Sequence, residues 1–213
     1  MADLDFFFDP VCPWAWITSR WVTEVQGLRS YDVQWNFISL RFLNEEKMDY
    51  SKMPEGYADV HHSGTRGLRV AARARAEQGN EAVGRVYTAL GTSIHNLGQR
   101  DLFVKDTRGH VGSLLTAAGL PGEWAESVDD ESFDAVIRTE TELALERTGK
   151  DVGTPILTFR PGATDEGSFF GPVISTIPRG EEATRLWDAV ETIATSSGLA
   201  ELKRSLRARP SFD

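Results

Sequence analysis

Runs of apolar residues divide this chain into two strand-forming ends and a helical middle. Residues 4–8 form a short and mainly apolar run, which predicts a strand buried on both faces of a central sheet. Apolar residues then recur at intervals of three and four, which predicts a helix from Pro13 to about Val25. Residues 32–40 alternate in polarity, so a second strand is expected. The chain therefore begins β-α-β, and such a crossover favours parallel strands.

The middle of the chain has helical patterning. A loop is expected at residues 41–54, and the helices that follow carry apolar stripes repeating every three or four residues. The stripes comprise Val83, Tyr87, Leu90, Ile94 and Leu97, then Val111, Leu114, Leu115 and Ala118, and finally Phe133, Val136 and Ile137. Asp130 is expected to cap the last of these helices, which should end near Gly149.

Strand patterning returns after the helical block. Residues 155–159 and 168–171 predict two short strands that form a hairpin, and a closing helix begins near Pro178. The order predicts an α/β fold with one sheet, whose two halves are separated by an all-helical insertion. We expect the first half at residues 1–55, the insertion at 56–150, and the second half with the C-terminal helix at 151–213.

The only cysteine stands where the first strand meets the first helix. Cys12 is followed by Pro13, which suits the first turn of a helix because its missing N–H would be unpaired there anyway. A thiol at a helix N-terminus lies in the positive end of the helix dipole, so we expect its pKa below the ordinary value of about 8.5. A buried Cys that acts only as a small hydrophobe is the alternative. Trp14 comes next, at a position that is usually exposed, and we expect it to face the substrate.

Composition narrows the class of protein. The chain has 213 residues, 40% of them hydrophobic, and no apolar run approaches the roughly 18 residues of a membrane span. Its net charge of −9 argues against nucleic-acid binding. One cysteine cannot form an internal disulfide, and the acidic N-terminus lacks the basic region of a signal peptide. We therefore expect a cytoplasmic protein with no membrane partner.

Cofactor-binding patterns are weak in this sequence. His61-His62 has no acidic or Cys partners at ligand spacing, so we expect this pair on a solvated loop and no metal site. No Gly-rich phosphate loop precedes a helix, so no nucleotide cofactor is implied.

Two further polar groups allow both a structural and a functional interpretation. Arg66, Arg69 and Arg73 share a helix face, where they either remain solvated beside carboxylates or hold an anionic substrate. His95 and Asn96 stand at the end of an apolar stripe, and are either structural or lie near the thiol.

Several short motifs carry a resemblance to a known family. The sequence resembles a thioredoxin fold with a helical insertion, because Cys-Pro stands at the first strand–helix junction and Thr154-Pro155 at the start of the third strand. More closely, it is similar to the DsbA-type group that includes mycothiol-dependent nitroreductases. The motifs are Asp9-Pro10-Val11-Cys12-Pro13-Trp14, Ile94-His95-Asn96, Asp151-Val152-Gly153-Thr154-Pro155, Phe170-Gly171-Pro172 and Ile177-Pro178-Arg179-Gly180.

The resemblance implies a site and a chemistry. It implies a cis bond between Thr154 and Pro155, lying against the redox-active Cys12. It places Trp14, Asn44 and Tyr57 beside the thiol, lining a pocket for a thiol or an aromatic substrate. It also implies mycothiol, or another small thiol, as co-substrate.

The sequence departs from the family pattern at one position. The motif Cys-Pro-Trp-Cys ends here in Ala15, so no second thiol can break a mixed disulfide. The leading hypothesis is a one-cysteine oxidoreductase that acts on disulfide or nitroaromatic substrates, as a monomer or homodimer. A kappa-like glutathione transferase or isomerase needs no second cysteine and is the alternative. A non-enzymatic thioredoxin-like binder is the third.

Overall fold

A computed structural model describes residues 2–213, which divide into two compact units. The first unit comprises residues 2–8, 12–36 and 144–213, and the second comprises residues 9–11 and 37–143. The strands of the sheet are β1 (Leu4–Phe8), β2 (Val33–Phe37), β3 (Ile156–Phe159) and β4 (Gly167–Phe170). The sheet therefore draws its strands from both ends of the chain, as the sequence predicts.

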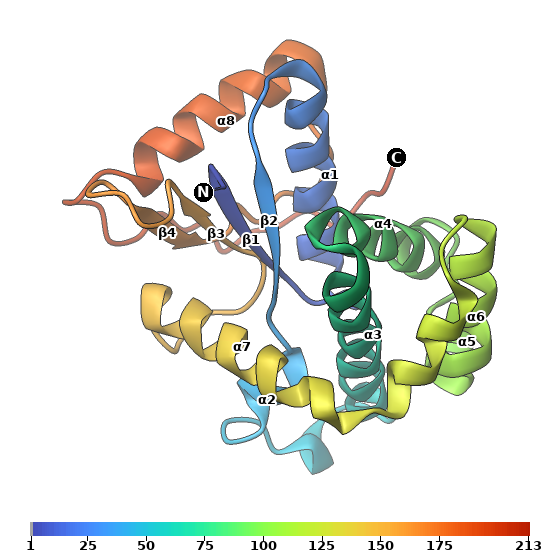
Figure 1. The fold of residues 1–213 in the computed structure, drawn as a ribbon. Helices are drawn as coiled ribbons and strands as arrows, with labels where there is room; N and C mark the ends of the chain where they lie inside the picture. Colours follow the sequence, from blue (N-terminus) through green and yellow to red (C-terminus); the bar gives the residue numbers. More distant parts are fainter. Residues whose placement is uncertain (1) are drawn as a thin grey trace. The chain divides into compact units, whose positions relative to one another are not determined.

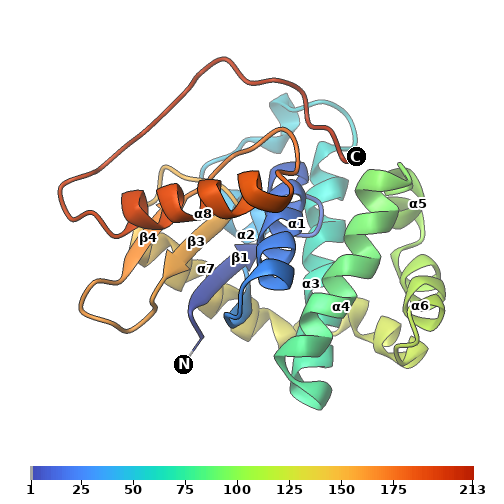
Figure 2. The same cartoon turned by 90° about the horizontal axis from the view of Figure 1, so that it is seen from above.

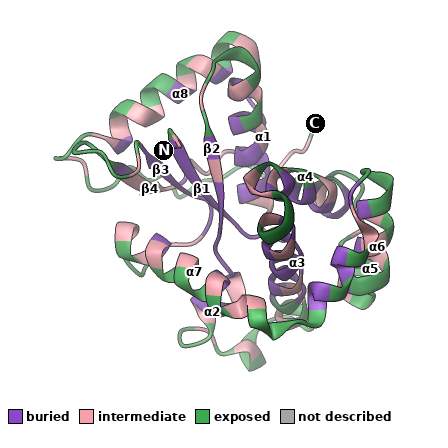
Figure 3. Ribbon diagram, viewed as in Figure 1, coloured by how far each residue is buried: buried purple, intermediate pink, exposed green. Residues whose placement is uncertain are grey.

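The four strands lie in the order β2-β1-β3-β4. β1 and β3 are antiparallel, with Phe6 opposite Leu157, and β3 and β4 are antiparallel, with Leu157 opposite Phe169. The hairpin predicted at residues 155–171 is thus confirmed. Figure 3 shows β1 as a buried strand, and Phe6, Phe7 and Phe8 are at most 1% exposed.

Two helices cover one face of this sheet. They are α1 (Pro13–Leu28) and α8 (Gly180–Ala194), which lie side by side in Figures 1 and 2. The indole N–H of Trp21 donates to the carbonyl of Ala183 across 2.9 Å, and the Trp21 ring packs 5.5 Å from that of Trp187. This aromatic contact fixes α1, and with it the helix N-terminus that carries Cys12.

The second unit is built from helices. They are α2 (Leu40–Asn44), η1 (Tyr50–Lys52), α3 (Tyr57–Gln78), α4 (Asn80–Gly91), η2 (Thr92–Asn96), α5 (Arg100–Lys105), α6 (Thr107–Ala117), η3 (Gly122–Asp129), η4 (Glu131–Phe133) and α7 (Asp134–Thr148), whose end belongs to the first unit. Residues 41–54 were expected to form a loop, and this prediction is wrong. The Ser39 hydroxyl accepts from the N–H of Phe42 and starts α2, and Asp49 caps η1 in the same way.

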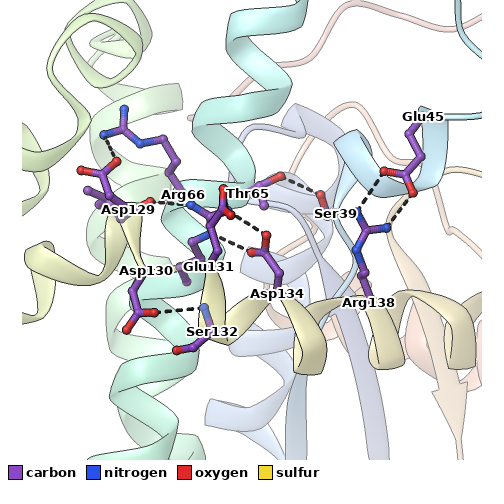
Figure 4. A network of polar contacts seen from close by, with 12 residues as sticks. Ser39, Glu45, Thr65, Arg66, Asp129, Asp130, Glu131, Ser132, Asp134 and Arg138 are labelled. Carbon is purple, nitrogen blue, oxygen red and sulfur yellow. Dashed lines mark hydrogen bonds and ion pairs between the residues drawn. The ribbon is translucent and has the colours of Figure 1, made fainter.

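Polar contacts tie α3 to its neighbours in this unit. The guanidinium of Arg69 makes two bonds of 2.7 and 2.8 Å to the carboxylate of Asp134 and a third to the Val128 carbonyl. Figure 4 shows the ion pair of Arg66 with Asp129 and the 2.8 Å bond between the hydroxyls of Ser39 and Thr65. Arg69 is only 4% exposed, so of the two alternatives for this arginine face the solvated one is wrong for Arg69, although its neighbour Asp134 is a carboxylate.

A π-helical turn explains where one predicted stripe ends. The stripe on α4 is buried through Ile94, but Leu97 is 62% exposed. In η2 the N–H of Leu97 bonds to the carbonyl of Thr92, five residues back, so the turn holds one more residue than an α-helical turn. The extra residue rotates Leu97 away from the face that Ile94 shares. No helix within residues 2–213 is long and apolar enough to cross a bilayer.

Candidate functional site

Cys12 is the N-cap residue of α1. Its backbone is extended, its carbonyl accepts the first helical bond from the N–H of Trp16 at 3.1 Å, and Pro13 occupies the first helical turn. The side chain is 6% exposed. The sequence order of strand, Cys-Pro and helix therefore gives a thiol at the positive end of a 16-residue helix.

The sulfur of Cys12 lies between a hydrogen-bond donor and an acceptor. The backbone N–H of Ala15 donates to Sγ across 3.5 Å, and the S–H group donates to the carbonyl of Thr154 across 3.3 Å. The Ala15 N–H favours the thiolate, while the Thr154 carbonyl favours the thiol. Loss of the proton removes the bond to Thr154 and leaves the bond from the Ala15 N–H, which favours the thiolate.

The loop before β3 presents Thr154 to the thiol. The Thr154–Pro155 peptide bond is cis, and the hydroxyl of Thr154 donates to the carbonyl of Phe7 across 3.1 Å. Thr154 and Pro155 are both buried. β1 and β3 are neighbours in the sheet. The bond from Thr154 to Phe7 therefore joins the loop before β3 to β1, the strand that leads toward Cys12. Cys12, Thr154 and Pro155 are thus brought together within the first unit.

The remaining residues of the motif lie in the first turn of α1. Trp14 is half-buried, and Ala15 is fully buried. A second cis bond, Gly171–Pro172, was not expected from the sequence. The hydroxyl of Thr18 donates to the Pro172 carbonyl across 2.9 Å and fastens that loop to α1.

His95 belongs to the second unit and lies on the π-helical turn η2. Its ring atom Nε2 is 2.9 Å from the carbonyl oxygen of Pro10. Burial lowers the pKa of His95 to about 4, so the ring is neutral at neutral pH and its Nε2–H donates to this carbonyl. Asn96, the next residue, is exposed.

Asn44 and Tyr57 also belong to the second unit. The side-chain amide of Asn44 donates to the carbonyl of Leu40 across 2.7 Å and closes the short helix α2. Tyr57 is the first residue of α3, is 36% exposed, and packs its ring 4.6 Å from that of His61.

The structure corrects the expectation for His61 and His62. Both lie inside α3 rather than on a solvated loop, and His61 is buried while His62 is exposed. The Nδ1 atom of His61 is 2.8 Å from the hydroxyl of Tyr50. Burial lowers the pKa of His61, so this bond joins a neutral ring to a neutral phenol. Tyr57 and His61 are four residues apart on α3, and this spacing is the sequence signal for the contact between their rings.

The carboxyl group of Asp9 is a buried polar feature that the sequence analysis did not single out. Asp9 is 0% exposed, and it accepts the N–H of Val11 at 3.0 Å and that of Leu40 at 2.8 Å. Burial raises the pKa of Asp9 to about 7, although both N–H groups act in the opposite direction. An acidic residue directly after the apolar run Phe6-Phe7-Phe8 is the signal that could have found it.

A comparison with protein-family models shows the family of this chain. A family model described as Rv2466c-like, mycothiol-dependent nitroreductase Rv2466c, matches residues 11–204. The chain is 28% identical over 205 residues to the uncharacterized protein Rv2286c of Mycobacterium tuberculosis (strain ATCC 25618 / H37Rv), covering 96% of this chain and 82% of that protein.

Solved structures show the same fold at low sequence identity. One is the cytosolic disulfide reductase DsbM from Pseudomonas aeruginosa, with a TM-score of 0.58, 16% identity, and coverage of 89% of this chain and 98% of that one. Another is a putative protein disulfide isomerase from Nitrosomonas europaea, with a TM-score of 0.54, 14% identity, and coverage of 88% and 95%. The predicted α/β, thioredoxin-like fold with a helical insertion is confirmed.

Proposed function

Because the chain belongs to the Rv2466c-like family, we propose that it is a thiol-dependent oxidoreductase whose reactive group is Cys12. The observation that carries the proposal is the position of the Cys12 sulfur. It lies at the N-terminus of α1, within hydrogen-bond distance of the Ala15 N–H and of the Thr154 carbonyl, which belongs to the cis Thr154–Pro155 peptide bond. The first of these contacts stabilises a thiolate, which is the form that attacks a disulfide.

The proposed reaction needs only one protein thiol. The Cys12 thiolate attacks a substrate disulfide in which one half is a small thiol, so that the other half leaves as a thiolate. The small thiol then remains on Cys12 as a mixed disulfide. A second molecule of the small thiol, as its thiolate, attacks the sulfur of the small thiol bound to Cys12. This step releases the Cys12 thiolate and the symmetric disulfide of the small thiol. The two electrons come from the small thiol.

Mycothiol, or a similar small thiol, is the proposed co-substrate, and no metal or nucleotide takes part. Support comes from the family description and from a solved structure of DsbM with GSH, which has a TM-score of 0.52 and 16% identity and covers 78% of this chain and 88% of that one. The family description also suggests nitroaromatic substrates. Two thiols reduce one nitro group to a nitroso group, giving one disulfide and one water.

We further propose roles for the remaining site residues. Pro13 and the Thr154–Pro155 bond shape the surroundings of Cys12. The residues proposed to line the substrate pocket are Trp14, Asn44, Tyr57, His95 and Asn96. The chain would act in the cytoplasm, as a monomer or homodimer.

A thiol S-transferase or isomerase of the kappa type is the second candidate. The observation that favours it is Ala15, because a transferase needs a thiol-binding site but no second cysteine. In this alternative the small thiol is consumed by conjugation and Cys12 forms no covalent intermediate.

Intact-mass measurement after incubation with oxidised mycothiol, and separately with oxidised glutathione, tests the proposal. The wild type should gain the mass of one small thiol, which a reducing thiol removes, and Cys12→Ser should gain none. No adduct on the folded wild type, with conjugation that survives Cys12→Ser, would instead support the transferase.

A further inference from the structure

The three residues before Cys12 are held by the helical unit. Asp9, Pro10 and Val11 belong to the second unit, and Val11 is covalently joined to Cys12. The carboxyl group of Asp9 accepts the N–H of Val11 through Oδ1 and the N–H of Leu40 through Oδ2. The ring of His95 donates to the carbonyl of Pro10. Hydrogen bonds therefore fix every residue of this segment.

Two glycines of α3 allow the helix to approach the segment closely. A Cβ on Gly64 would lie 2.5 Å from Oδ1 of Asp9, and a Cβ on Gly67 would lie 3.2 Å from Cγ of Pro10. Residues three apart lie on the same side of a helix, so both glycines face the segment. Asp9 is thus enclosed by the backbone of α3 on one side and by the start of α2 on the other.

Burial distinguishes Asp9 from two other aspartates with the same local geometry. Asp49 and Asp130 each accept the N–H of the residue two positions later, as Asp9 does, but both are exposed. Their hydrogen bonds lower their pKa values, whereas burial raises the pKa of Asp9 to about 7. The turn alone therefore does not account for the properties of Asp9.

We propose that Asp9 is a positioning residue for Cys12, whose carboxyl group holds residues 9–11 differently in its charged and neutral forms and so changes the reactivity of the thiol. The inference rests on the proposed function in one respect, that Cys12 reacts as a thiol. When Asp9 is ionised, both of its oxygens accept charge-assisted bonds from backbone N–H groups. Protonation turns one oxygen into a hydroxyl, which accepts less strongly, and the bond from Val11 or from Leu40 weakens.

The ionisable groups around Asp9 include Tyr50, on which the charges of Asp9, Tyr57, Arg41 and Glu45 act. His61 is bonded to Tyr50, and His95 is bonded to the carbonyl of Pro10. Burial lowers the pKa of both histidines and raises that of Tyr50, so all three are neutral. A change of charge near pH 7 in this group therefore belongs to Asp9.

Alkylation of the single cysteine tests the proposal directly. Rate constants for iodoacetamide labelling are measured by intact mass from pH 5 to pH 9, and every label reports Cys12 because the chain has one cysteine. The wild type should show an inflection near pH 7 in addition to that of the thiol. Asp9→Asn, which is close in shape and has no carboxyl proton, should lose the inflection near pH 7. Asp130→Asn, the exposed counterpart, should retain it.

The outcomes separate this proposal from the function it rests on. Equal pH profiles for the wild type and folded Asp9→Asn would overturn the positioning role. If folded wild type is not labelled at any pH while the unfolded chain is, the reactive-thiol function fails, and the positioning role fails with it.

A measurement without the Asp9 variant covers the case in which Asp9→Asn does not fold. Cys12→Ser protein carrying ¹³C in its aspartate carboxyl groups should show one carboxyl that titrates near pH 7. An inflection at the same pH in the wild-type labelling profile supports the proposal. The proposal is overturned if no aspartate carboxyl titrates near pH 7, or if the labelling profile has no inflection at the pH where that carboxyl titrates.

Discussion

The backbone N–H of Ala15 donates a hydrogen bond to the sulfur of Cys12 from the residue where the family motif has a second cysteine. The amide contributes to the stability of a thiolate whatever side chain follows it. The side chain determines only whether a mixed disulfide can be broken from within the protein. Under the proposed function, Ala15 therefore leaves the attack by Cys12 in place and removes the thiol that would break the mixed disulfide.

Ala15→Cys should restore an internal route for breaking the mixed disulfide. The new thiol would lie one helical turn from Cys12, on the residue whose N–H already reaches Sγ. Under limiting small thiol, the wild type should accumulate the adduct, while the variant should lose two hydrogens in mass and carry no adduct. Ala15→Ser, close in volume but without a thiol, is the control and should keep the adduct. An adduct that persists on Ala15→Cys would contradict this account.

Arg69→Met should destabilise the protein far more than Arg73→Met. Arg69 is buried and makes two bonds to Asp134, so its loss leaves an unpaired carboxylate at a cost of about 3–5 kcal/mol. Arg73 lies four residues later on α3 and pairs with Glu77 near the surface, where such a pair contributes about 0.5 kcal/mol or less. Chemical denaturation of both variants measures the difference. Equal losses would show that the Arg69 pair contributes no more than a surface pair.

Most of the fold could be predicted from the apolar pattern, because strands buried on both faces show near-continuous apolar runs and helices show a period of 3.6 residues. The hairpin and the α1 stripe of Ile17, Trp21 and Val25 follow from this. Two features do not. Leu97 is turned outward by a π-helical turn that leaves no mark in the apolar pattern, and α2 begins at a serine cap inside a segment too short for periodicity.

Cys12 could be located from the sequence because its surroundings are local. The Cys-Pro order itself places the thiol at the start of a helix. The properties of Asp9 and His61 could not be assigned, because both residues are buried by the fold and bonded to residues 31 and 11 positions away, Leu40 and Tyr50. A resemblance to a family names residues of a site, but it does not give the packing that changes their pKa values.

Gly64→Ala should destabilise the protein, although alanine is the better helix former. The added Cβ would lie 2.5 Å from Oδ1 of Asp9, and such overpacking costs about 1–3 kcal/mol. Gly27→Ala is the matched control, because Gly27 lies in α1 with nothing within 4 Å of the new Cβ. It should gain up to about 1 kcal/mol from helix propensity. Thermal unfolding compares the two, and a stabilised Gly64→Ala would show that Asp9 is not held tightly against α3.

The stability difference between the wild type and Asp9→Asn should depend on pH between 5 and 8. Burial raises the pKa of Asp9 from 3.8 in the unfolded chain to about 7 in the folded one. Between these values the folded state holds a proton that the unfolded state has lost, so the free energy of unfolding falls as pH rises and levels off above pH 7. At 1.36 kcal/mol per pKa unit, the change over the whole interval from 3.8 to about 7 is on the order of 4 kcal/mol, and about 3 kcal/mol of it should fall between pH 5 and pH 8.

Comparison with the variant isolates this contribution, because the titrations of the histidines are common to both proteins and cancel. At pH 5 the wild type should be the more stable, since the asparagine of the variant would present an amide N–H₂ to one of the two backbone N–H donors. As pH rises to 8 that advantage should shrink and then reverse, because only the wild type must then bury a charge. The pair Asp130 and Asp130→Asn should show no such trend, since the pKa of exposed Asp130 lies below its ordinary value. Urea unfolding at four pH values measures both differences, and an Asp9 difference that does not change with pH would mean that the carboxyl group does not titrate in this range.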